Sequence, residues 1–215
     1  MESQDDRLGL PNGAFAKLDM APDEVFYEPA RLVTHIDDGA IAALTALYRE
    51  MLPAGGVLLD LMSSWVSHLP PEIDYSEVIG HGMNPAELTA NPRLSRWFTQ
   101  NLNRDTALPL ADRSIDAATI CVSIQYLQQP VAVLREIARV LRPGGPVVIS
   151  FSNRCFWTKA VAVWRSLDDA GHARLVDRYL RQAGFAATET RVLAEGVEDV
   201  SDPMIAVIGR APETC

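Results

Sequence analysis

Residues 108 to 151 read LPLADRSIDAATICVSIQYLQQPVAVLREIARVLRPGGPVVISF, and this stretch decides the fold. The apolar, partly β-branched run from Ile115 to Cys121 is typical of a strand buried on both faces. The period changes between Val131 and Arg142, where apolar residues recur at helical spacing opposite arginine and glutamate. Pro143-Gly144-Gly145 ends this predicted helix, and a second apolar run from Val147 to Phe151 follows. The stretch therefore predicts one β–α–β unit of a parallel sheet.

The same stretch resembles the second half of a class I S-adenosyl-L-methionine (SAM) dependent methyltransferase of the type 11 group. The resemblance rests on the opening LPLADRSID, the helix end REIARVLRPGG and the strand VVIS. It implies a Rossmann-like open α/β sheet of about seven strands, with helices on both faces. It further implies that the sheet is mostly parallel with an antiparallel C-terminal hairpin. SAM would be the cofactor and methyl transfer the activity.

The rest of the chain continues the alternation of strands and helices that an open α/β sheet requires. Further strands are predicted at residues 57–62, 77–80, 96–102, 185–193 and 204–208, and further helices at 37–51, 157–167 and 176–183. We interpret residues 1–35 as an N-terminal segment that is partly mobile and forms a possible lid. Residues 36–215 are then a single methyltransferase-like domain.

Composition favours one domain and excludes two classes of partner. With 215 residues and 48% hydrophobic residues, the chain can form one sizeable core. The net charge of −9, without any run of lysine or arginine, disfavours binding to a nucleic-acid backbone. No apolar stretch approaches the about 20 residues of a membrane helix. We therefore expect a small-molecule substrate and neither a nucleic acid nor a membrane as partner, while no pattern indicates an oligomeric state.

The N-terminus and the cysteines indicate a cytoplasmic protein. Residues 1–6 are acidic and polar, unlike the apolar centre of a signal peptide. Cys121, Cys155 and Cys215 make an odd number without metal-ligand spacing, which is typical of reduced thiols. The four histidines also lack the spacing of metal ligands, so we expect no metal site.

Ligands of open α/β sheets bind at the carboxyl ends of the strands, which makes the loop after the first strand decisive. The resembled family has D/E-x-G-x-G-x-G there, and this chain has Asp60-Leu61-Met62-Ser63-Ser64-Trp65-Val66. The acid is retained and all three glycines are replaced. Ser63 and Ser64 can offer hydroxyl and N–H groups to a carboxylate. Two interpretations remain: a variant loop that binds SAM, or a cofactor site that has decayed.

The variant-loop interpretation agrees with a second resemblance. The segments DLMSSWVSH and SFSNRCF together resemble a subgroup of uncharacterised methyltransferases with a variant SAM loop. In the family, an acid at the end of the second strand binds the ribose, and Gly82 occupies that place here. His81 or Asn84 are candidates to replace it. Asn101 takes the place of an aspartate beside the adenine, and its amide can still accept a hydrogen bond.

The resemblance thus implies a cofactor site at the strand ends and in the N-terminal segment, with no catalytic residue assigned. Its predicted members are Asp60, Met62, Ser63, Ser64, Gly82, Met83, Asn101, Leu102, Val122, Ser123, Tyr126, Tyr27 and Arg31.

Four of the candidate side chains have two interpretations each. Tyr126 either lies under the adenine or packs in the core, and Arg31 either pairs with the SAM carboxylate or stays solvated. Arg154 either binds an anionic substrate or forms a surface salt bridge. Cys155 beside Arg154 is either a thiol of lowered pKa or a buried structural thiol.

These patterns favour a SAM-dependent methyltransferase that acts on a small-molecule acceptor. The alternative is a non-catalytic methyltransferase-like protein that binds a nucleoside ligand or a protein partner. The absent glycines and the absent ribose acid favour the alternative.

Overall fold

The structure is a computed structural model that describes residues 8–198 and 200–213. The N-terminal stretch expected to be mobile falls partly on residues 1–7, which lie outside the described residues. Seven strands form one sheet in the order β3-β2-β1-β4-β5-β7-β6. The strands are β1 (Val57–Leu61), β2 (Glu77–Gly82), β3 (Arg96–Thr99), β4 (Ala117–Cys121), β5 (Pro146–Phe151), β6 (Ala187–Ala194) and β7 (Met204–Arg210).

The strand pairing confirms the predicted fold class. β7 runs antiparallel to both of its neighbours, β5 and β6, and the other four pairings are parallel. The chain passes outward from β1 through β2 to β3 and then returns to place β4 on the other side of β1. The carboxyl ends of β1 and β4 therefore meet where the strand order reverses, which is the expected ligand position in such sheets.

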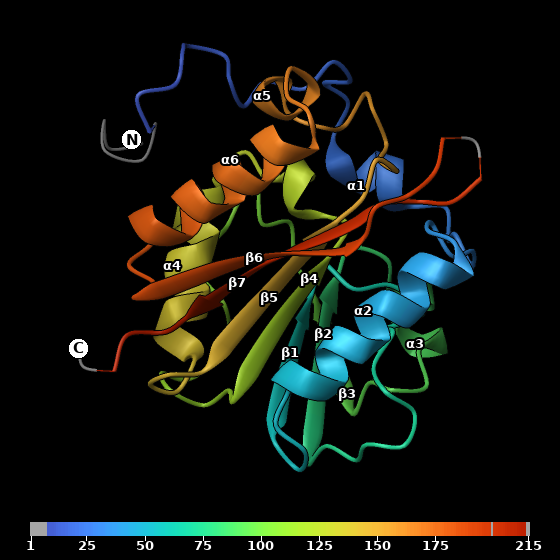
Figure 1. Cartoon of the computed structure of the whole chain (residues 1–215), viewed down its shortest axis with the longest axis vertical. Helices are drawn as coiled ribbons and strands as arrows, with labels where there is room; N and C mark the ends of the chain where they lie inside the picture. Colours follow the sequence, from blue (N-terminus) through green and yellow to red (C-terminus); the bar gives the residue numbers. More distant parts are fainter. Residues whose placement is uncertain (1–7, 199, 214–215) are drawn as a thin grey trace.

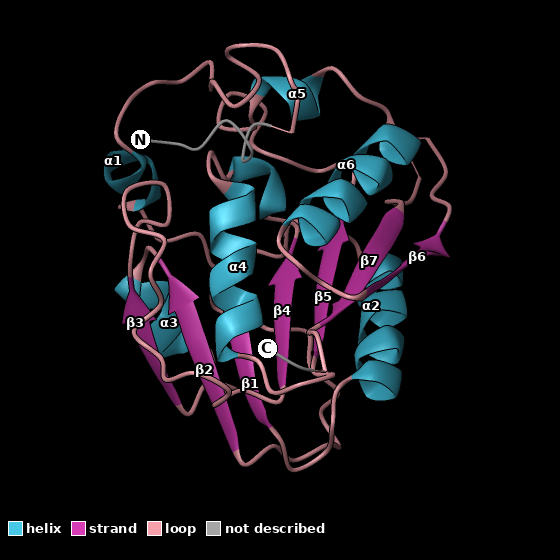
Figure 2. Ribbon diagram, turned by 90° about the vertical axis from the view of Figure 1, so that its left-hand side faces the viewer, coloured by secondary structure: helices cyan, strands magenta, loops and turns pink. Residues whose placement is uncertain are grey.

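Helices cover both faces of the sheet. They are α1 (Asp23–Tyr27), α2 (Asp38–Met51), α3 (Pro85–Ala90), α4 (Pro130–Val140), α5 (Ala162–Arg165) and α6 (Asp169–Gln182). Figure 1 shows α4 and α6 on one side of the sheet, and α2 and α3 on the other. Figure 2 shows α1 and α5 at the end of the molecule toward which the central parallel strands point. No helix of the described residues is long and apolar enough to cross a membrane.

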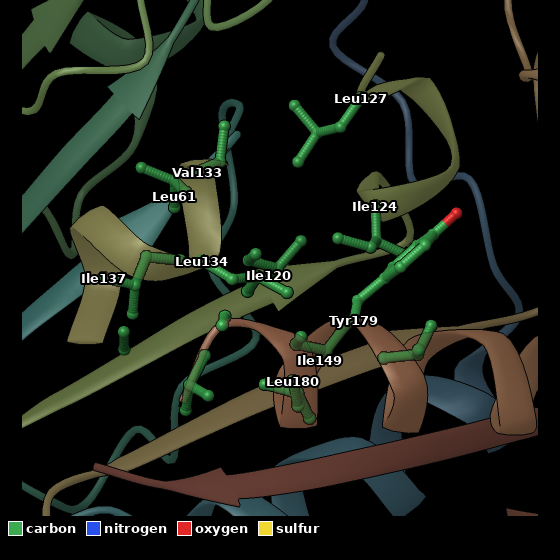
Figure 3. Close-up of a cluster of buried hydrophobic side chains, with 14 of the residues drawn as sticks. Leu61, Ile120, Ile124, Leu127, Val133, Leu134, Ile137, Ile149, Tyr179 and Leu180 are labelled. Carbon is green, nitrogen blue, oxygen red and sulfur yellow. The ribbon is translucent and has the colours of Figure 1, made fainter. Parts of the chain in front are cut away.

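The central strands are buried on both faces, as their apolar runs predict. Figure 3 shows Ile120 of β4 and Ile149 of β5 among side chains of α4 and α6, including Leu134 and Tyr179. A second cluster on the opposite face packs α2 against the sheet through Leu44, Leu47 and Tyr48. Each such side chain contributes about 1.5–3 kcal/mol when fully removed from water.

The helix predicted over residues 157–167 is wrong for most of its length, because only α5 is helical there. The segment instead lies along the N-terminal segment: Leu18 N–H donates to the Thr158 carbonyl, and Val163 N–H donates to the Ala14 carbonyl. Backbone groups that pair across chain segments cannot also form the hydrogen bonds of a helix. The apolar spacing of Ala160 and Trp164 reflects burial against the core without a continuous helix.

Two short helices were absent from the sequence prediction. α1 lies in the N-terminal segment, where the sequence shows no helical period. α3 begins directly after β2 with Asn84 as N-cap and Pro85 as the first residue. The Asn84 Oδ1 accepts hydrogen bonds from Ala86 N and Glu87 N, so Asn-Pro followed by Glu was a readable start signal.

Candidate functional site

A cavity of about 340 Å³ lies at the carboxyl ends of β1, β2 and β4. Every residue of the predicted cofactor site lines it, from Tyr27 and Arg31 in the N-terminal segment to Tyr126 after β4. The structure therefore brings together all the residues that the sequence assigned to one site. The cavity is also lined by residues that the prediction left out, among them His35, Ser67, His68, Glu87, Asn103, Cys121, Arg154, Cys155 and Phe156.

The acid of the first loop, Asp60, is buried beside this cavity with a relative exposure of 4%. Its two carboxylate oxygens accept hydrogen bonds from Ser63 Oγ at 2.5 Å and from Thr119 Oγ1 at 2.9 Å. Burial raises the pKa of Asp60 above its ordinary value, although the hydroxyls of Ser63, Ser67 and Thr119 oppose that shift. Since no basic side chain of the described residues pairs with it, this buried carboxylate favours a cationic group in the cavity.

The loop after β1 keeps a glycine-like backbone without glycine. Met62 has a φ of 57°, which is the left-handed region that glycine adopts without strain. Met62 N–H donates to His81 Nδ1 at 3.1 Å, and Ser63 N–H donates to the His81 carbonyl at 2.7 Å. The expectation that Ser63 offers its N–H and hydroxyl to a ligand is therefore wrong, because His81 and Asp60 accept both. Ser64 also lines the cavity.

His81 is fixed as a neutral imidazole by two backbone partners. Its Nδ1 accepts from Met62 N–H, so its Nε2 carries the proton and donates to the Gln100 carbonyl at 3.0 Å. Burial lowers the pKa of His81 to about 4. Because both ring nitrogens form hydrogen bonds with backbone groups of the protein, the prediction that His81 replaces the ribose-binding acid is wrong.

Gly82 ends β2 at a point where no side chain fits. A Cβ on Gly82 would lie 2.7 Å from the Ser63 carbonyl oxygen and 3.2 Å from Leu88 Cδ2. An acidic residue is therefore excluded from this position by the path of the first loop. Asn84 does not replace it either, because its Oδ1 caps α3 and its Nδ2 donates to the Tyr27 and Glu28 carbonyls at 2.9 Å.

The N-terminal segment borders the cavity, with Tyr27, Arg31 and His35 among the lining residues. The Arg31 guanidinium lies 4.6 Å from the Phe26 ring centroid and 5.3 Å from that of Phe156, and it donates to the Phe26 carbonyl. Burial raises the pKa of Tyr27 well above its ordinary value. Arg31 is thus held by aromatic rings at the cavity, and its pairing with a SAM carboxylate stays a prediction.

A buried ion cluster fastens this segment to the domain. The sequence has only two lysines, Lys17 and Lys159, and both are buried in this cluster. Lys17 Nζ lies 2.8 Å from an Asp23 oxygen, and Lys159 Nζ lies 3.3 Å from Asp19 and 3.4 Å from Asp23. Asn103 Nδ2 also donates to Asp23, at 2.9 Å. These contacts join α1 to the loops before β4 and α5.

On the adenine side of the prediction, Asn101 faces α1. Its Nδ2 donates to Glu24 Oε1 at 2.9 Å, and its Oδ1 accepts from Asn103 N. Tyr126 is 6% exposed, stacks on Phe156 at 5.9 Å, and accepts a hydrogen bond from Phe156 N–H at its hydroxyl. The structure thus gives Tyr126 a packing role at the cavity wall, and its contact with adenine remains a prediction.

The loops after β4 and β5 also line the cavity. Val122 has a φ of 42°, an outlier for a β-branched residue. Of the five non-glycine residues with positive φ in the described part of the chain, three line the cavity: Met62, His68 and Val122. Such strained backbone persists where the surrounding contacts impose it, and it gathers at binding sites. Ser123 also lines the cavity, and its Oγ donates to the Cys121 carbonyl at 2.9 Å.

Arg154 and Cys155 have the less reactive of the roles considered for them. Arg154 Nε donates to Asp202 Oδ1 at 2.6 Å, and the arginine side chain is 63% exposed. Burial raises the pKa of Cys155, so the idea that Arg154 lowers it is wrong. Both residues still line the cavity, and no disulfide joins Cys155 to Cys121. Cys215 lies outside the described residues.

Comparison with known proteins adds the family. Residues 68–149 match the family described as methyltransferase domain. A demethylmenaquinone methyltransferase of Paenarthrobacter aurescens is 41% identical over 163 residues, which are 71% of this chain and 62% of the relative. A malonyl-[acyl-carrier protein] O-methyltransferase of Methylococcus capsulatus is 31% identical over 102 residues, which are 44% of this chain and 37% of the relative.

Solved structures share the fold. A SAM-dependent methyltransferase of Mesorhizobium loti superposes with a TM-score of 0.54 at 18% identity, and the match covers 78% of this chain and 97% of that one. In sequence and in fold the chain is similar to SAM-dependent methyltransferases. It spans only about a third of the length of the first curated relatives it matches.

The family match begins at His68, after the loop in which this chain departs most from the glycine motif. The residues present nevertheless fit SAM as a ligand. The cavity volume lies within the range of about 300–1,000 Å³ that is typical of small-molecule sites. Met62 has the left-handed backbone that glycine commonly adopts, and Gly82 places no side chain at the end of β2. Asp60 supplies a buried carboxylate for a cationic group.

Proposed function

We propose that this chain is a SAM-dependent methyltransferase that acts on a small-molecule acceptor. The observation that carries the proposal is the cavity at the carboxyl ends of β1, β2 and β4, which gathers every residue assigned to the cofactor from the sequence. When bound, SAM supplies a methyl group on a sulfonium that is open to attack by a nucleophilic atom.

The chain's own residues would hold and shield this cofactor. Asp60 would face its ammonium group, and Arg31 would approach its carboxylate from the N-terminal segment. Tyr126 and Phe156 would exclude water from one side, since both line the cavity and stack on each other. Alignment of the two reactants can carry much of the rate acceleration, so no general base is assigned.

Charge and size support a small acceptor. SAM carries a sulfonium, and a protein of net charge −9 attracts it at long range. The same charge disfavours a nucleic acid, and a cavity of about 340 Å³ suits a metabolite better than a polymer. The free thiols of Cys121 and Cys155 support the expected cytoplasmic location.

A second function is favoured by one observation. The N–H groups of Met62 and Ser63 are both taken by His81, so the loop offers fewer backbone donors than a glycine-rich loop would. A non-catalytic protein that binds a nucleoside or a protein partner would tolerate that loss.

The deciding experiment measures thermal unfolding with S-adenosylhomocysteine, the demethylated product. At a hundredfold excess over the dissociation constant, linkage gives about 2.7 kcal/mol of stabilisation, a rise of several degrees in Tm. Adenosine at the same concentration is the control, because a nucleoside-binding protein would respond equally to both. A flat response to S-adenosylhomocysteine at millimolar concentration, in melting and in calorimetry, would end the methyltransferase proposal.

Transfer of labelled methyl groups from SAM to quinol and carboxylate acceptors then tests the reaction itself.

A further inference from the structure

Three acidic side chains line the cavity, and they differ in how many partners they already have. They are Asp23, Asp60 and Glu87. The Asp23 carboxylate binds Lys17 and Asn103, and the Asp60 carboxylate accepts from Ser63 and Thr119. In both residues each carboxylate oxygen therefore already accepts at least one hydrogen bond from the protein.

Glu87 is the exception. Its Oε1 accepts a hydrogen bond from Arg31 N–H at 2.7 Å, and no hydrogen bond within residues 8–198 and 200–213 reaches its Oε2. The side chain is half-buried, and its burial raises its pKa above the ordinary value. A partly desolvated carboxylate with one open oxygen favours a ligand that donates hydrogen bonds.

The position of Glu87 relates it to the end of β2. It lies on the first turn of α3, five residues after Gly82, and Asn84 fixes this turn by capping Ala86 and Glu87. Gly82 cannot carry an acid because of the Ser63 carbonyl oxygen, and His81 is used internally. Glu87 is thus the acidic side chain that remains available on the β2 side of the cavity.

We infer that Glu87 binds the vicinal hydroxyls of the cofactor's ribose, with Oε2 accepting from the diol while Oε1 stays bonded to Arg31 N–H. The inference rests on the proposed function, and it assigns the ribose subsite to the first turn of α3 instead of the end of β2. A diol donates two O–H groups, and a carboxylate accepts them without needing a donor of its own. The contact also links the ribose to the N-terminal segment through the Arg31 backbone.

The test compares S-adenosylhomocysteine with its 2′-deoxy and 3′-deoxy analogues by calorimetry on the full chain. We expect the wild type to bind the parent ligand about 10- to 100-fold more tightly than at least one analogue, as for a hydrogen bond to a charged group. In Glu87→Ala, this preference falls to within about threefold, because the acceptor is gone. Glu28→Ala is the matched control: it removes an exposed glutamate outside the cavity lining and keeps the wild-type preference.

The ratio of affinities separates recognition from a purely structural role. Loss of the Arg31 contact would lower the affinities for the parent ligand and for its analogues equally, so the ratio of these affinities would not change. Glu87→Gln retains the volume and an acceptor for Arg31 N–H, so it serves if Glu87→Ala does not fold, and its ratio is also reduced. If both variants keep the wild-type ratio of affinities for the parent ligand and its deoxy analogues, the inference about Glu87 is wrong, while the proposed function stands. A wild type that binds no S-adenosylhomocysteine overturns the proposed function and the inference with it.

Discussion

The β4–α4–β5 unit and the loop after β1 are close neighbours, because β1 pairs with β4 in the sheet, but different kinds of contact determine their structures. The unit is built from apolar side chains at strand and helix spacing, and all of β5 is buried. The loop after β1 is polar, contains left-handed Met62, and takes its shape from His81 on another strand. A local pattern encodes the first region, while long-range polar contacts define the second.

This difference predicts that the two regions respond differently to substitution. Damage to the β4–α4–β5 unit lowers the stability of the whole domain. Damage to the polar contacts around the cavity alters ligand binding and detaches the N-terminal segment locally, while the sheet stays folded. Four measurements test this contrast.

The largest effect is expected for Lys159→Ala. Lys159 is fully buried between Asp19 and Asp23, and removing one partner of a buried ion pair costs about 3–5 kcal/mol. Hydrogen exchange is expected to show the loss mainly in α1 and its neighbours. Arg49→Ala is the control, since its pair with Glu72 is exposed to solvent and its loss is expected to change stability little. Uniform destabilisation of the whole sheet would contradict the contrast.

Leu134→Ala tests the other region. Leu134 is fully buried in α4 against the sheet, and truncation of such a leucine costs about 2–5 kcal/mol. Urea unfolding is expected to show this loss, while the affinity for S-adenosylhomocysteine, measured well below the transition, stays within about twofold. Leu32→Ala, at a 56% exposed leucine, is expected to change stability by about 0.5 kcal/mol or less. A large loss of affinity in the folded Leu134→Ala protein would show that the two regions are not separable.

His81 adds a pH dependence to the polar region. Its folded-state pKa of about 4 lies below the ordinary 6.5, so the folded protein favours the neutral ring. The stability it contributes is complete above pH 6.5 and is lost as the pH falls through about 4. The difference between the two values corresponds to about 3 kcal/mol.

His81→Asn should flatten that pH profile, because asparagine can accept from Met62 N–H but does not titrate. Unfolding free energies of both proteins between pH 7 and pH 4 measure the effect. Parallel profiles would show that the His81 proton is not coupled to folding.

The smallest effect concerns backbone conformation. Arg113 is exposed with a φ of 50°, so Arg113→Gly removes local strain and stabilises by at most about 1 kcal/mol. Ala111→Gly, at an exposed residue without positive φ, is the control and is expected to destabilise slightly. Since neither Ala111 nor Arg113 lines the cavity, S-adenosylhomocysteine binding should not change. A loss of stability in Arg113→Gly would show that the left-handed turn carries no strain.

The sequence predicted where the strands lie along the chain, most directly for the central ones, because burial on both faces leaves an apolar run. It also placed the members of the site together, since the carboxyl ends of parallel strands converge. It did not predict that α5 is short, because the pairing of Val163 with Ala14 involves residues far apart in the chain. The role of His81 was missed for the same reason: its partners Met62 and Gln100 come from two other strands' ends.

Glu87 was missed although a local signal existed. Asn84-Pro85 followed by Glu87 reads as a helix start, which places the glutamate on a first turn beside the strand end. What could not be read is the hydrogen bond from Arg31 N–H, which depends on the path of the N-terminal segment over α3.

The two buried lysines have a consequence for chemical labelling. Apart from the N-terminal amine, Lys17 and Lys159 are the only primary amines in the sequence, and neither is accessible while α1 is in place. An amine-reactive reagent therefore modifies these two lysines only while the N-terminal segment is transiently detached and their amines are exposed. The acylation rate of these two lysines would then report how often the N-terminal segment detaches. Slower acylation with a bound nucleoside would reveal a link between the segment and the cavity without any enzymatic assay.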